Sequence, residues 1–335
     1  MNKNIKNNSF LITGGTGSFG KAFVSKLINS NKKIKRLVIY SRDELKQFEM
    51  SQIFSKEKFP FIRYFIGDVR DGKRLKTAME GIDTVIHAAA LKQVPSTEYN
   101  PFEAIKTNII GAQNIIENSI SSNVHTVIAL STDKACAPVN LYGATKLCSD
   151  KLFISANKIK GNKSIRFSVV RYGNVFGSRG SVYRVFKNFL DKKYFPITHK
   201  DMTRFNITLA EGAHLVYDSL KKIYGGEIIV PKLKSFKITD LAKSMSSKNK
   251  IKFVGIRPGE KIHEQMISSS DSYNTVETKN FFAILPQGDD AILSYYKKKF
   301  SAKMTKRGFE YSSENNKPYM NIKEIKKIIE NAEKN

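Results

Sequence analysis

The chain has 335 residues, of which 41% are hydrophobic and 26% charged, so it is too apolar for wholesale disorder and long enough for about two domains. No run approaches the roughly 20 apolar residues that cross a bilayer, so we expect neither a membrane-spanning protein nor a membrane partner. The formal net charge of +27 suits a nucleic-acid ligand, but the basic residues are spread along the whole chain without a zinc-finger or RNA-recognition signature. We therefore expect a lysine-rich solvated surface, some cations that meet an anionic substrate, and no nucleic-acid partner.

The first residues and the cysteines bear on where the protein works and on whether it holds disulfides or a metal. The first apolar run, Ser9–Thr13, is too short for the core of a signal peptide, which predicts a cytoplasmic protein. The two cysteines, Cys136 and Cys148, cannot form a disulfide framework, and neither they nor the five histidines have the spacing of metal ligands. We predict no metal site.

Short β-branched or apolar runs alternate with helix-length segments through the first half of the chain. We predict strands at Phe10–Thr13, Leu37–Tyr40, Ile62–Ile66, Thr84–His87, Thr126–Leu130 and Ile165–Val170. Strands separated by helices form βαβ units with right-handed crossovers, which build a parallel sheet covered by helices on both faces. The pattern predicts an α/β fold whose residues 1–172 form a doubly wound parallel Rossmann sheet that binds a dinucleotide.

The alternation weakens after residue 172. Gly173–Gly180 is rich in glycine, Phe205–Ile223 has the pattern of one amphipathic helix, and Lys237–Ser246 has the pattern of another. We interpret residues 173–335 as a smaller C-terminal substrate-binding lobe at the carboxyl edge of the sheet, with segments that can cross between the two parts.

A glycine loop joins the first strand to the first helix. Gly15, Gly17 and Gly20 fit G-x-G-x-x-G, and Gly14 with the last two fits a related spacing. Glycines allow a tight turn and a close approach of the backbone to a pyrophosphate, which then lies at the helix N-terminus. A loop that follows a strand and opens a helix is the context that the motif requires. The cofactor contacts that we predict here are Gly14, Thr16, Gly17, Ser18, Phe19 and Gly20.

The end of the second strand indicates which dinucleotide binds. An NAD site has a carboxylate here for the ribose 2′-hydroxyl, whereas an NADP site has a cation for the 2′-phosphate. Ser41 and Arg42 lie at the position of the acid, with Lys46 one helical turn on. Because arginine can bind phosphate oxygens bidentately, the segment favours NADP over NAD. Asp43 is a further cofactor contact or, alternatively, the cap of the next helix.

Residues after the third and fourth strands complete the predicted cofactor site. Asp68 and Val69 are placed to contact the adenine, and Ala88 follows the fourth strand. The plain alternative for Asp68 is a turn or an N-cap.

Four residues after the fifth strand form a candidate catalytic group. Tyr142 and Lys146 are four residues apart, so on a helix they share a face, and a nearby ammonium favours the phenolate needed for base catalysis. Asp133 and Lys134 directly follow the strand. The structural alternatives are a surface helix pair for the first two and a solvated loop ion pair for the second two.

The chain resembles the extended short-chain dehydrogenase/reductase family, and within it the inverting UDP-N-acetylglucosamine 4,6-dehydratases of pseudaminic acid biosynthesis. The segments that carry this resemblance, over nearly the whole chain, are Thr13–Gly20, Ser41–Met50, His87–Val94, Ser131–Asp150, Met202–Leu209, Ile256–Met266 and Phe309–Asn316. The triplet Thr132-Asp133-Lys134 is the most specific part, since dehydratases that retain configuration typically carry Thr-Asp-Glu. Asn206 departs from the pattern, because the family has an aromatic residue there that contacts sugar or uracil.

The resemblance implies an NADP-dependent hydro-lyase. Tyr142, a phenolate beside Lys146, takes the C4-hydroxyl proton of UDP-N-acetylglucosamine while a hydride leaves C4, and Thr132 orients that hydroxyl. Lys134, neutral because the site depresses its pKa, removes the C5 proton, and a protonated Asp133 assists the departure of the C6 hydroxyl as water. The hydride returns to C6, and protonation of C5 from the other face gives the 4-hexulose of L-arabino configuration. The donor of that last proton stays open.

The resemblance also implies contacts to the nucleotide sugar, and these are weaker predictions. Each residue has surface charge or loop capping as its plain alternative. The candidates are Lys92, Thr132, Asn174, Arg179, Thr198, Arg204, Arg257 and Glu260.

Two other kinds of function stay open at this point. One keeps the fold but makes a C4 epimerase or a retaining dehydratase. The other is a non-catalytic dinucleotide sensor or nucleic-acid-binding protein, which would have no need of the four catalytic candidates. The family tends to pair through the helices of Phe102–Ser121 and Tyr142–Ile159, so we expect a homo-oligomer, with a hexamer as one form.

Overall fold

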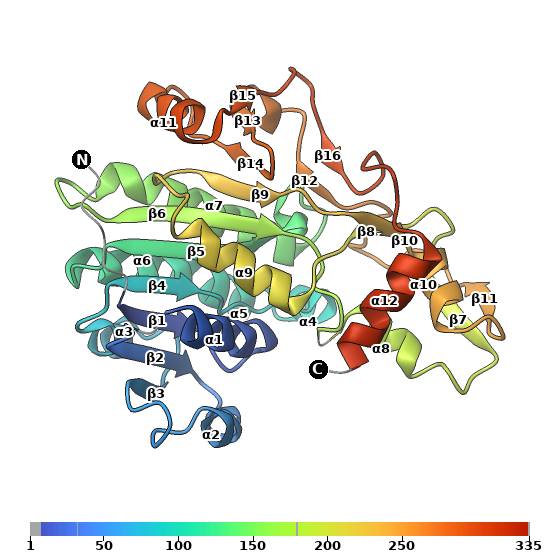
Figure 1. Ribbon diagram of the computed structural model, residues 1–335, viewed down its shortest axis with the longest axis horizontal. Coiled ribbons are helices and arrows are strands. Elements are labelled where there is room, and N and C mark those ends of the chain that lie inside the picture. Colours follow the sequence, from blue (N-terminus) through green and yellow to red (C-terminus); the bar gives the residue numbers. More distant parts are fainter. Residues whose placement is uncertain (1–7, 32, 179, 334–335) are drawn as a thin grey trace.

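A large, mostly parallel sheet forms the centre of the computed structural model, which describes residues 8–31, 33–178 and 180–333 (Figure 1). Its ten strands run in the order β15-β13-β14-β9-β6-β5-β4-β1-β2-β3. The seven that pair in parallel are β1 (Ser9–Thr13), β2 (Arg36–Ser41), β3 (Ile62–Ile66), β4 (Thr84–His87), β5 (Thr126–Thr132), β6 (Arg166–Tyr172) and β9 (Ile228–Pro231). The order 3-2-1-4-5-6 is that of a Rossmann sheet, so the predicted fold class is confirmed.

Helices cover both faces of this sheet. Successive side chains along each strand point to opposite faces, so both faces carry apolar residues that must be buried. In β1, Leu11 belongs to the core on one face, whereas Phe10 and Ile12 belong to the core on the other. The first face packs on α3 (Gly72–Met79), α6 (Gly111–Ser121) and α7 (Leu141–Ile159). The second packs on α1 (Ser18–Ser30), α2 (Glu44–Ile53), α9 (Leu209–Ser219) and α11 (Asp290–Phe300). These layers bring the carboxyl ends of the parallel strands to one edge.

Three strands extend the sheet from the C-terminal half of the chain. They are β13 (Thr275–Glu277), β14 (Phe281–Ile284) and β15 (Lys303–Met304), each antiparallel to its neighbour. Together with β9 they come from residues after 172, so segments do cross into the large sheet. The division into two domains at residue 172 stays a prediction.

The C-terminal lobe has a core of its own, which combines aromatic residues such as Phe186, Phe195 and Phe236 with aliphatic ones. Figure 1 shows the lobe beside the carboxyl edge of the large sheet. Its elements are α8 (Val182–Lys187), β7 (Tyr194–Ile197), β8 (Thr203–Phe205), β10 (Ser235–Lys237), α10 (Ile238–Met245), β11 (Lys250–Phe253) and α12 (Ile322–Glu333). Two short strands, β12 (Gln265–Ile267) and β16 (Tyr311–Ser312), pair next to it.

Of the two helices predicted in the second half of the chain, one is confirmed and the other was predicted too long. The predicted Lys237–Ser246 helix matches α10 within a residue at each end. The predicted Phe205–Ile223 helix was too long, because Phe205 belongs to β8 and pairs with Ser235. The helix α9 begins only after Thr208, which caps it in a reciprocal capping box with Glu211.

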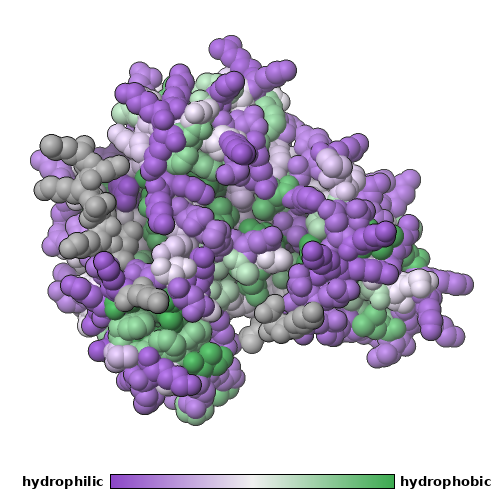
Figure 2. All heavy atoms as spheres, viewed as in Figure 1, coloured by the Kyte–Doolittle hydropathy of each residue, from purple (hydrophilic) through white to green (hydrophobic). Residues whose placement is uncertain are grey.

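Hydrophilic residues are spread over the visible faces of both the sheet region and the lobe (Figure 2). Within the described residues, no helix has both the length and the apolar composition that a membrane span requires. The described part of the chain also contains no cluster of metal-ligating side chains.

Candidate active site

A cavity of about 770 Å³ extends from the glycine loop, along the carboxyl ends of the strands, to the C-terminal lobe. Nearly all the predicted site residues line it. They are Gly14, Thr16, Gly17, Ser18, Phe19, Gly20, Ser41, Arg42, Asp43, Lys46, Asp68, Val69, Ala88, Lys92, Thr132, Lys134, Tyr142, Lys146, Asn174, Thr198, Arg204, Arg257 and Glu260. Asp133 lies just behind the wall, in contact with Lys134. Arg179 is outside the described residues.

The glycine loop is shaped for close approach at the start of α1. Gly14 has a φ of +64°, and a Cβ on it would lie 3.0 Å from the backbone of Ala89. A Cβ on Gly20 would collide with the carbonyl group of Gly15, so the loop can pack on the helix only without side chains there. Gly17 is the N-cap of α1 and has no side chain to occupy the helix's free N–H groups. The helix N-terminus therefore faces the cavity as a site for an anion.

Two hydroxyls and two cations border the cavity beyond β2. Ser41 Oγ and Thr16 Oγ1 are 2.8 Å apart and tie the strand end to the glycine loop. The Arg42 side chain is half exposed and lies 3.4 Å from Asp68 Oδ2. Lys46 forms an ion pair with Asp43 on the first turn of α2.

Asp43 and Asp68 are both occupied by other groups. Asp43 is the N-cap of α2 and accepts a hydrogen bond from the Lys46 backbone at 3.0 Å, so the capping alternative is confirmed. Asp68 binds the guanidinium groups of Arg42 and Arg70, and Arg70 approaches to 2.7 Å. Their carboxylates are thus engaged by cations and backbone, which leaves the Arg42 guanidinium as the most exposed charged group at this end of the cavity.

Local packing brings Tyr142 to the end of β5. Asn140 caps α7 by accepting a hydrogen bond from the Gly143 backbone at 2.8 Å. A Cβ on Gly143 would collide with the carbonyl of Lys134, so the helix start packs directly on the short helix η2 (Asp133–Ala135). The first turn of α7 and the Asp133–Lys134 turn are therefore held against each other.

Tyr142 and Lys146 are both buried, and burial governs their ionisation. Burial raises the pKa of Tyr142 to about 12, although the charge of Lys134 and a hydrogen bond with Thr132 oppose it. Burial also lowers the pKa of Lys146, which Asp150 opposes. The predicted lowering of the tyrosine pKa by a nearby ammonium is thus wrong for the chain alone, because desolvation of the phenolate is the larger effect.

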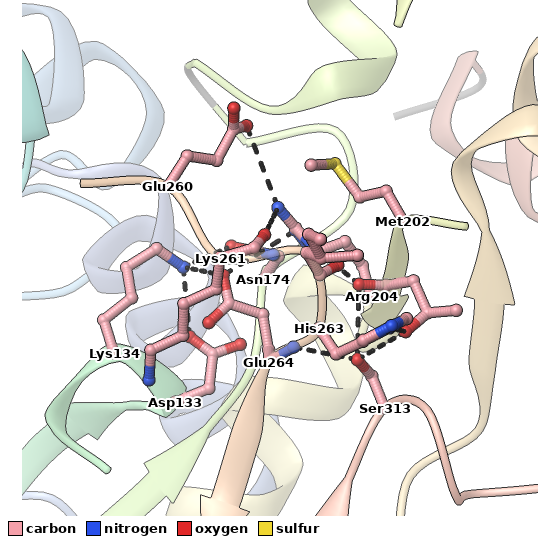
Figure 3. Close-up of polar contacts among 12 residues, drawn as sticks. Asp133, Lys134, Asn174, Met202, Arg204, Glu260, Lys261, His263, Glu264 and Ser313 are labelled. Carbon is pink, nitrogen blue, oxygen red and sulfur yellow. Dashed lines mark hydrogen bonds and ion pairs between the residues drawn. The ribbon is translucent and has the colours of Figure 1, made fainter. Parts of the chain in front are cut away.

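Lys134 belongs to the polar cluster drawn in Figure 3, where its amine points toward the neighbouring side chains. Its Nζ donates to Asp133 Oδ1 at 3.1 Å, Asn174 Oδ1 at 3.2 Å and Glu264 Oε1 at 3.0 Å. Three acceptors match the three protons of an ammonium. The two carboxylates raise the pKa of Lys134 above its ordinary value despite burial. The predicted depressed pKa of Lys134 is therefore wrong, since the carboxylates of Asp133 and Glu264 together outweigh the effect of burial on the amine.

Asp133 has the opposite tendency. Its side chain is fully buried, and burial together with the charge of Glu264 raises the pKa of its carboxyl group. Its Oδ2 has no hydrogen-bond partner among the described residues. This environment favours the protonated form of the carboxyl group, which the predicted acid requires.

Glu264 is the site residue that sequence reasoning missed. It lies just before β12, and Ser313 fixes its backbone through bonds of 2.7 and 2.9 Å. The Arg204 guanidinium lies 3.7 Å from its carboxylate. Its only signal was membership of the Ile256–Met266 segment, because 130 residues separate it from Lys134.

Among the predicted substrate contacts in the lobe, Arg204 is positioned by several hydrogen bonds, whereas Arg257 is not. Arg204 donates to the carbonyl groups of Thr203, Lys261 and Ile262, so backbone contacts position its guanidinium in the cavity wall. Arg257 is exposed and lies 3.9 Å from Glu260.

The remaining candidates differ in exposure. Thr198 is buried beside Met202, with its Oγ1 3.2 Å from the sulfur. Lys92 is exposed at the surface of the cavity, and partial desolvation together with the charge of Lys134 lowers its pKa. Asn206, the departure from the family pattern, is buried, and its Oδ1 has no partner among the described residues.

Comparison with known proteins gives relatives over the full chain. Residues 10–286 match the family model described as polysaccharide biosynthesis protein. The chain is 52% identical to a Campylobacter jejuni protein named UDP-N-acetylglucosamine 4,6-dehydratase (inverting), over 97% of this chain and 98% of that one. It is 40% identical to a Rickettsia bellii protein named UDP-glucose 4-epimerase, over 97% and 96% of the two chains.

Solved structures share the fold. Pen from Bacillus thuringiensis superposes with a TM-score of 0.87 at 35% identity, over 99% of both chains. A dTDP-glucose 4,6-dehydratase from Streptomyces venezuelae, solved with NAD bound, has a TM-score of 0.63 at 18% identity over 76% of this chain and 86% of that one. The second likeness shows the fold alone.

Proposed function

The chain belongs to the family of polysaccharide biosynthesis proteins, and from this premise we propose that it is an inverting UDP-N-acetylglucosamine 4,6-dehydratase, a hydro-lyase. Its product would be UDP-2-acetamido-2,6-dideoxy-β-L-arabino-hex-4-ulose. Identity of 52% over nearly the full length to a protein of that name supports the assignment. The observation that carries it is the contact between Asp133 and Lys134 beside Tyr142 in the wall of one cavity.

The residues of the glycine loop fit a dinucleotide cofactor. The close approach of Gly14 to Ala89 and the side-chain-free N-cap at Gly17 leave room and N–H groups for a pyrophosphate. When bound, the dinucleotide accepts a hydride from the sugar and returns it. We propose NADP rather than NAD, because Arg42 and Lys46 lie at the strand end where a 2′-phosphate would be.

The chain's own residues then divide the proton transfers. Tyr142 takes the proton of the C4 hydroxyl, which Thr132 orients. Because burial raises the pKa of Tyr142 to about 12, its phenolate needs positive charge, and Lys134 and Lys146 are the amines proposed to supply it. Lys134 removes the C5 proton, and Asp133 gives its proton to the departing C6 hydroxyl. One proton must then be added to C5 from the other face, and it offsets the proton that Tyr142 took from the C4 hydroxyl. The raised pKa of Asp133 supports the acid role. The raised pKa of Lys134 means that its ammonium must first pass a proton on, and Asp133 is an acceptor at 3.1 Å.

The remaining predicted contacts concern how the cofactor and the nucleotide sugar would share the cavity. The nicotinamide would lie beside Tyr142, and the diphosphate would extend toward the cations of the lobe. We propose Lys92, Asn174, Thr198, Arg204, Arg257 and Glu260 as contacts of the nucleotide sugar. Arg179 remains a candidate on sequence grounds.

Incubation with UDP-N-acetylglucosamine tests the proposal. NMR of the product should show a C4 ketone, a C6 methyl group and inverted C5. The Lys134→Ala variant should bind NADP as the wild type does but give no net dehydration. A wild-type product that retains the C6 hydroxyl and differs only at C4 would show an epimerase, the activity for which the Rickettsia relative is named. Normal turnover by Lys134→Ala would remove the proposed role of that lysine.

We also propose a cytoplasmic homo-oligomer, for example a hexamer. Phe102 and Ile159, on the helices expected to pair, are 63% and 64% exposed, which supports burial against a second copy. Sedimentation of the purified protein tests this, and a monomer at all concentrations would contradict it.

A further inference from the structure

Two buried carboxylates face one ammonium at the centre of the cavity wall. Lys134 Nζ lies 3.1 Å from Asp133 Oδ1 and 3.0 Å from Glu264 Oε1, and both carboxylate side chains are at most 3% exposed. The second oxygen of each carboxylate, Asp133 Oδ2 and Glu264 Oε2, has no hydrogen-bond partner among the described residues. The Lys134 ammonium therefore has two buried carboxylate partners, and the second of them, Glu264, also lies 3.7 Å from the Arg204 guanidinium.

Glu264, the second carboxylate, is held in place by residues other than Asp133 and Lys134. Ser313 holds its backbone, and Arg204 lies 3.7 Å from its Oε1. Arg204 and Lys134 keep the pKa of Glu264 below its ordinary value in spite of burial. Glu264 therefore stays ionised while Asp133, whose pKa is raised, takes up a proton more readily.

Other ionisable groups also face this cluster and contribute to its electrostatics. They are Lys92 after β4, Cys136 after η2, Tyr142 on α7, Arg204 on β8 and Lys261 before β12. The lysines and the arginine are bases, and burial raises the pKa of the Cys136 thiol to about 11 and that of Tyr142 to about 12, so none of these five groups adds a negative charge to the cluster. Glu264 is thus the fixed negative charge against which the Asp133–Lys134 pair titrates.

We propose that Glu264 is a positioning residue whose fixed charge keeps one shared proton on the Asp133–Lys134 pair and so lets the pair reset itself after each turnover. The inference rests on the proposed function and adds a role for a residue to which no proton transfer was assigned above. Glu264 acts through Lys134 and Asp133.

The protons of the pair balance over one cycle. Elimination begins with neutral Lys134 and protonated Asp133. Breaking the C5–H bond places that proton on Lys134, and the C6 hydroxyl leaves as water with the proton of Asp133. The pair is then an ammonium and a carboxylate, which is the contact that the structure contains at 3.1 Å. Transfer of one proton from Nζ to Oδ1 restores the starting form with no exchange with solvent.

The Glu264→Gln variant removes the charge and keeps the shape and an acceptor for Lys134. The active form of the pair holds one proton, so the pH profile of kcat has a limb where a second proton binds and a limb where the last one leaves. Loss of a negative charge at this distance makes both protonation steps less favourable. Both limbs should therefore move to lower pH by about 1–3 units. A residue with only a structural role would lower the height of the profile and leave its limbs in place.

Three further variants complete the test. Glu264→Asp keeps the charge, so its limbs should stay near the wild-type values even if its rate falls. Glu277→Gln removes an exposed carboxylate that pairs with Lys232 far along the sheet, and it should leave the profile unchanged. Asn174 also accepts from Nζ, so Glu264→Gln combined with Asn174→Asp restores a negative charge beside Lys134 and should move the limbs back. If Glu264→Gln does not fold, the pH profile of this double variant can be compared directly with that of the wild type.

The outcomes separate this inference from the function on which it rests. A wild-type chain that does not dehydrate UDP-N-acetylglucosamine overturns the proposed function. Normal wild-type dehydration, with limbs of Glu264→Gln that coincide with the wild-type limbs, overturns the role of Glu264 alone. Limbs of the double variant that remain at the position of the single variant would also overturn it.

Discussion

Replacing Arg42 with alanine tests which dinucleotide the cavity selects. A hydrogen bond to a charged group contributes about 1.5–3 kcal/mol. The Arg42 side chain is 51% exposed, and to reach a 2′-phosphate it must leave Asp68 at 3.4 Å. An exposed ion pair of this kind contributes about 0–1 kcal/mol, and Asp68 retains its closer partner Arg70 at 2.7 Å. The net loss on mutation is therefore about 0.5–3 kcal/mol, or roughly a 2- to 160-fold weaker affinity for NADP.

Calorimetric titration of wild type and Arg42→Ala with NADP and NAD measures this loss. The affinity for NADP should fall by that factor, and the affinity for NAD should change little because NAD has no 2′-phosphate. Arg63→Ala is the matched control, since it removes the same charge from β3 outside the cavity. Tighter binding of NAD than of NADP by the wild type, or an unchanged NADP affinity in Arg42→Ala, would refute the reasoning.

Three further predictions concern the catalytic tyrosine and the buried charges. Tyr142→Phe should stop the first oxidation, so reduction of the bound cofactor at the wild-type rate, followed by absorbance, would contradict the proton transfer. Arg171→Met leaves Asp150 buried without its partner at 3.2 Å and should lower the free energy of unfolding by about 3–5 kcal/mol. Urea denaturation checks this, and wild-type stability would count against it. Burial lowers the pKa of His87 from 6.5 to about 3, so only the unfolded chain takes up this proton as the pH falls below 6.5. Stability should therefore drop by about 2 kcal/mol more between pH 7 and pH 5 in the wild type than in His87→Gln, and equal drops would contradict this.

The parallel part of the fold was predictable because its strands are short, β-branched and buried on both faces. The predicted strands Ile62–Ile66 and Thr84–His87 match β3 and β4 to the residue. The antiparallel extension was not predictable in the same way. Strand β14 pairs with β9, about 50 residues earlier in the chain, and no local pattern marks such a pairing. The same limit made Phe205 look helical, since its partner Ser235 lies in β10.

The positions of the candidate site could be predicted better than its charges. The spacing of Tyr142 and Lys146 on α7, and the glycine loop before α1, are local features that place side chains at the sheet edge. The raised pKa of Lys134 depends on the adjacent Asp133 and also on Glu264, 130 residues away, and only the packed fold brings this second carboxylate to the amine. Burial of Tyr142 also follows from the packed fold and not from its neighbours in sequence.

The central claim is that the hydrogen removed from C4 returns to C6 of the same sugar. UDP-N-acetylglucosamine carrying deuterium at C4, mixed with unlabelled substrate bearing a heavy-isotope acetyl group, tests it directly by NMR and mass spectrometry of the product. The account predicts that the deuterium appears in the C6 methyl group of the molecules that carried it at C4. Deuterium that stays at C4, is lost to solvent or appears on the other substrate would contradict it.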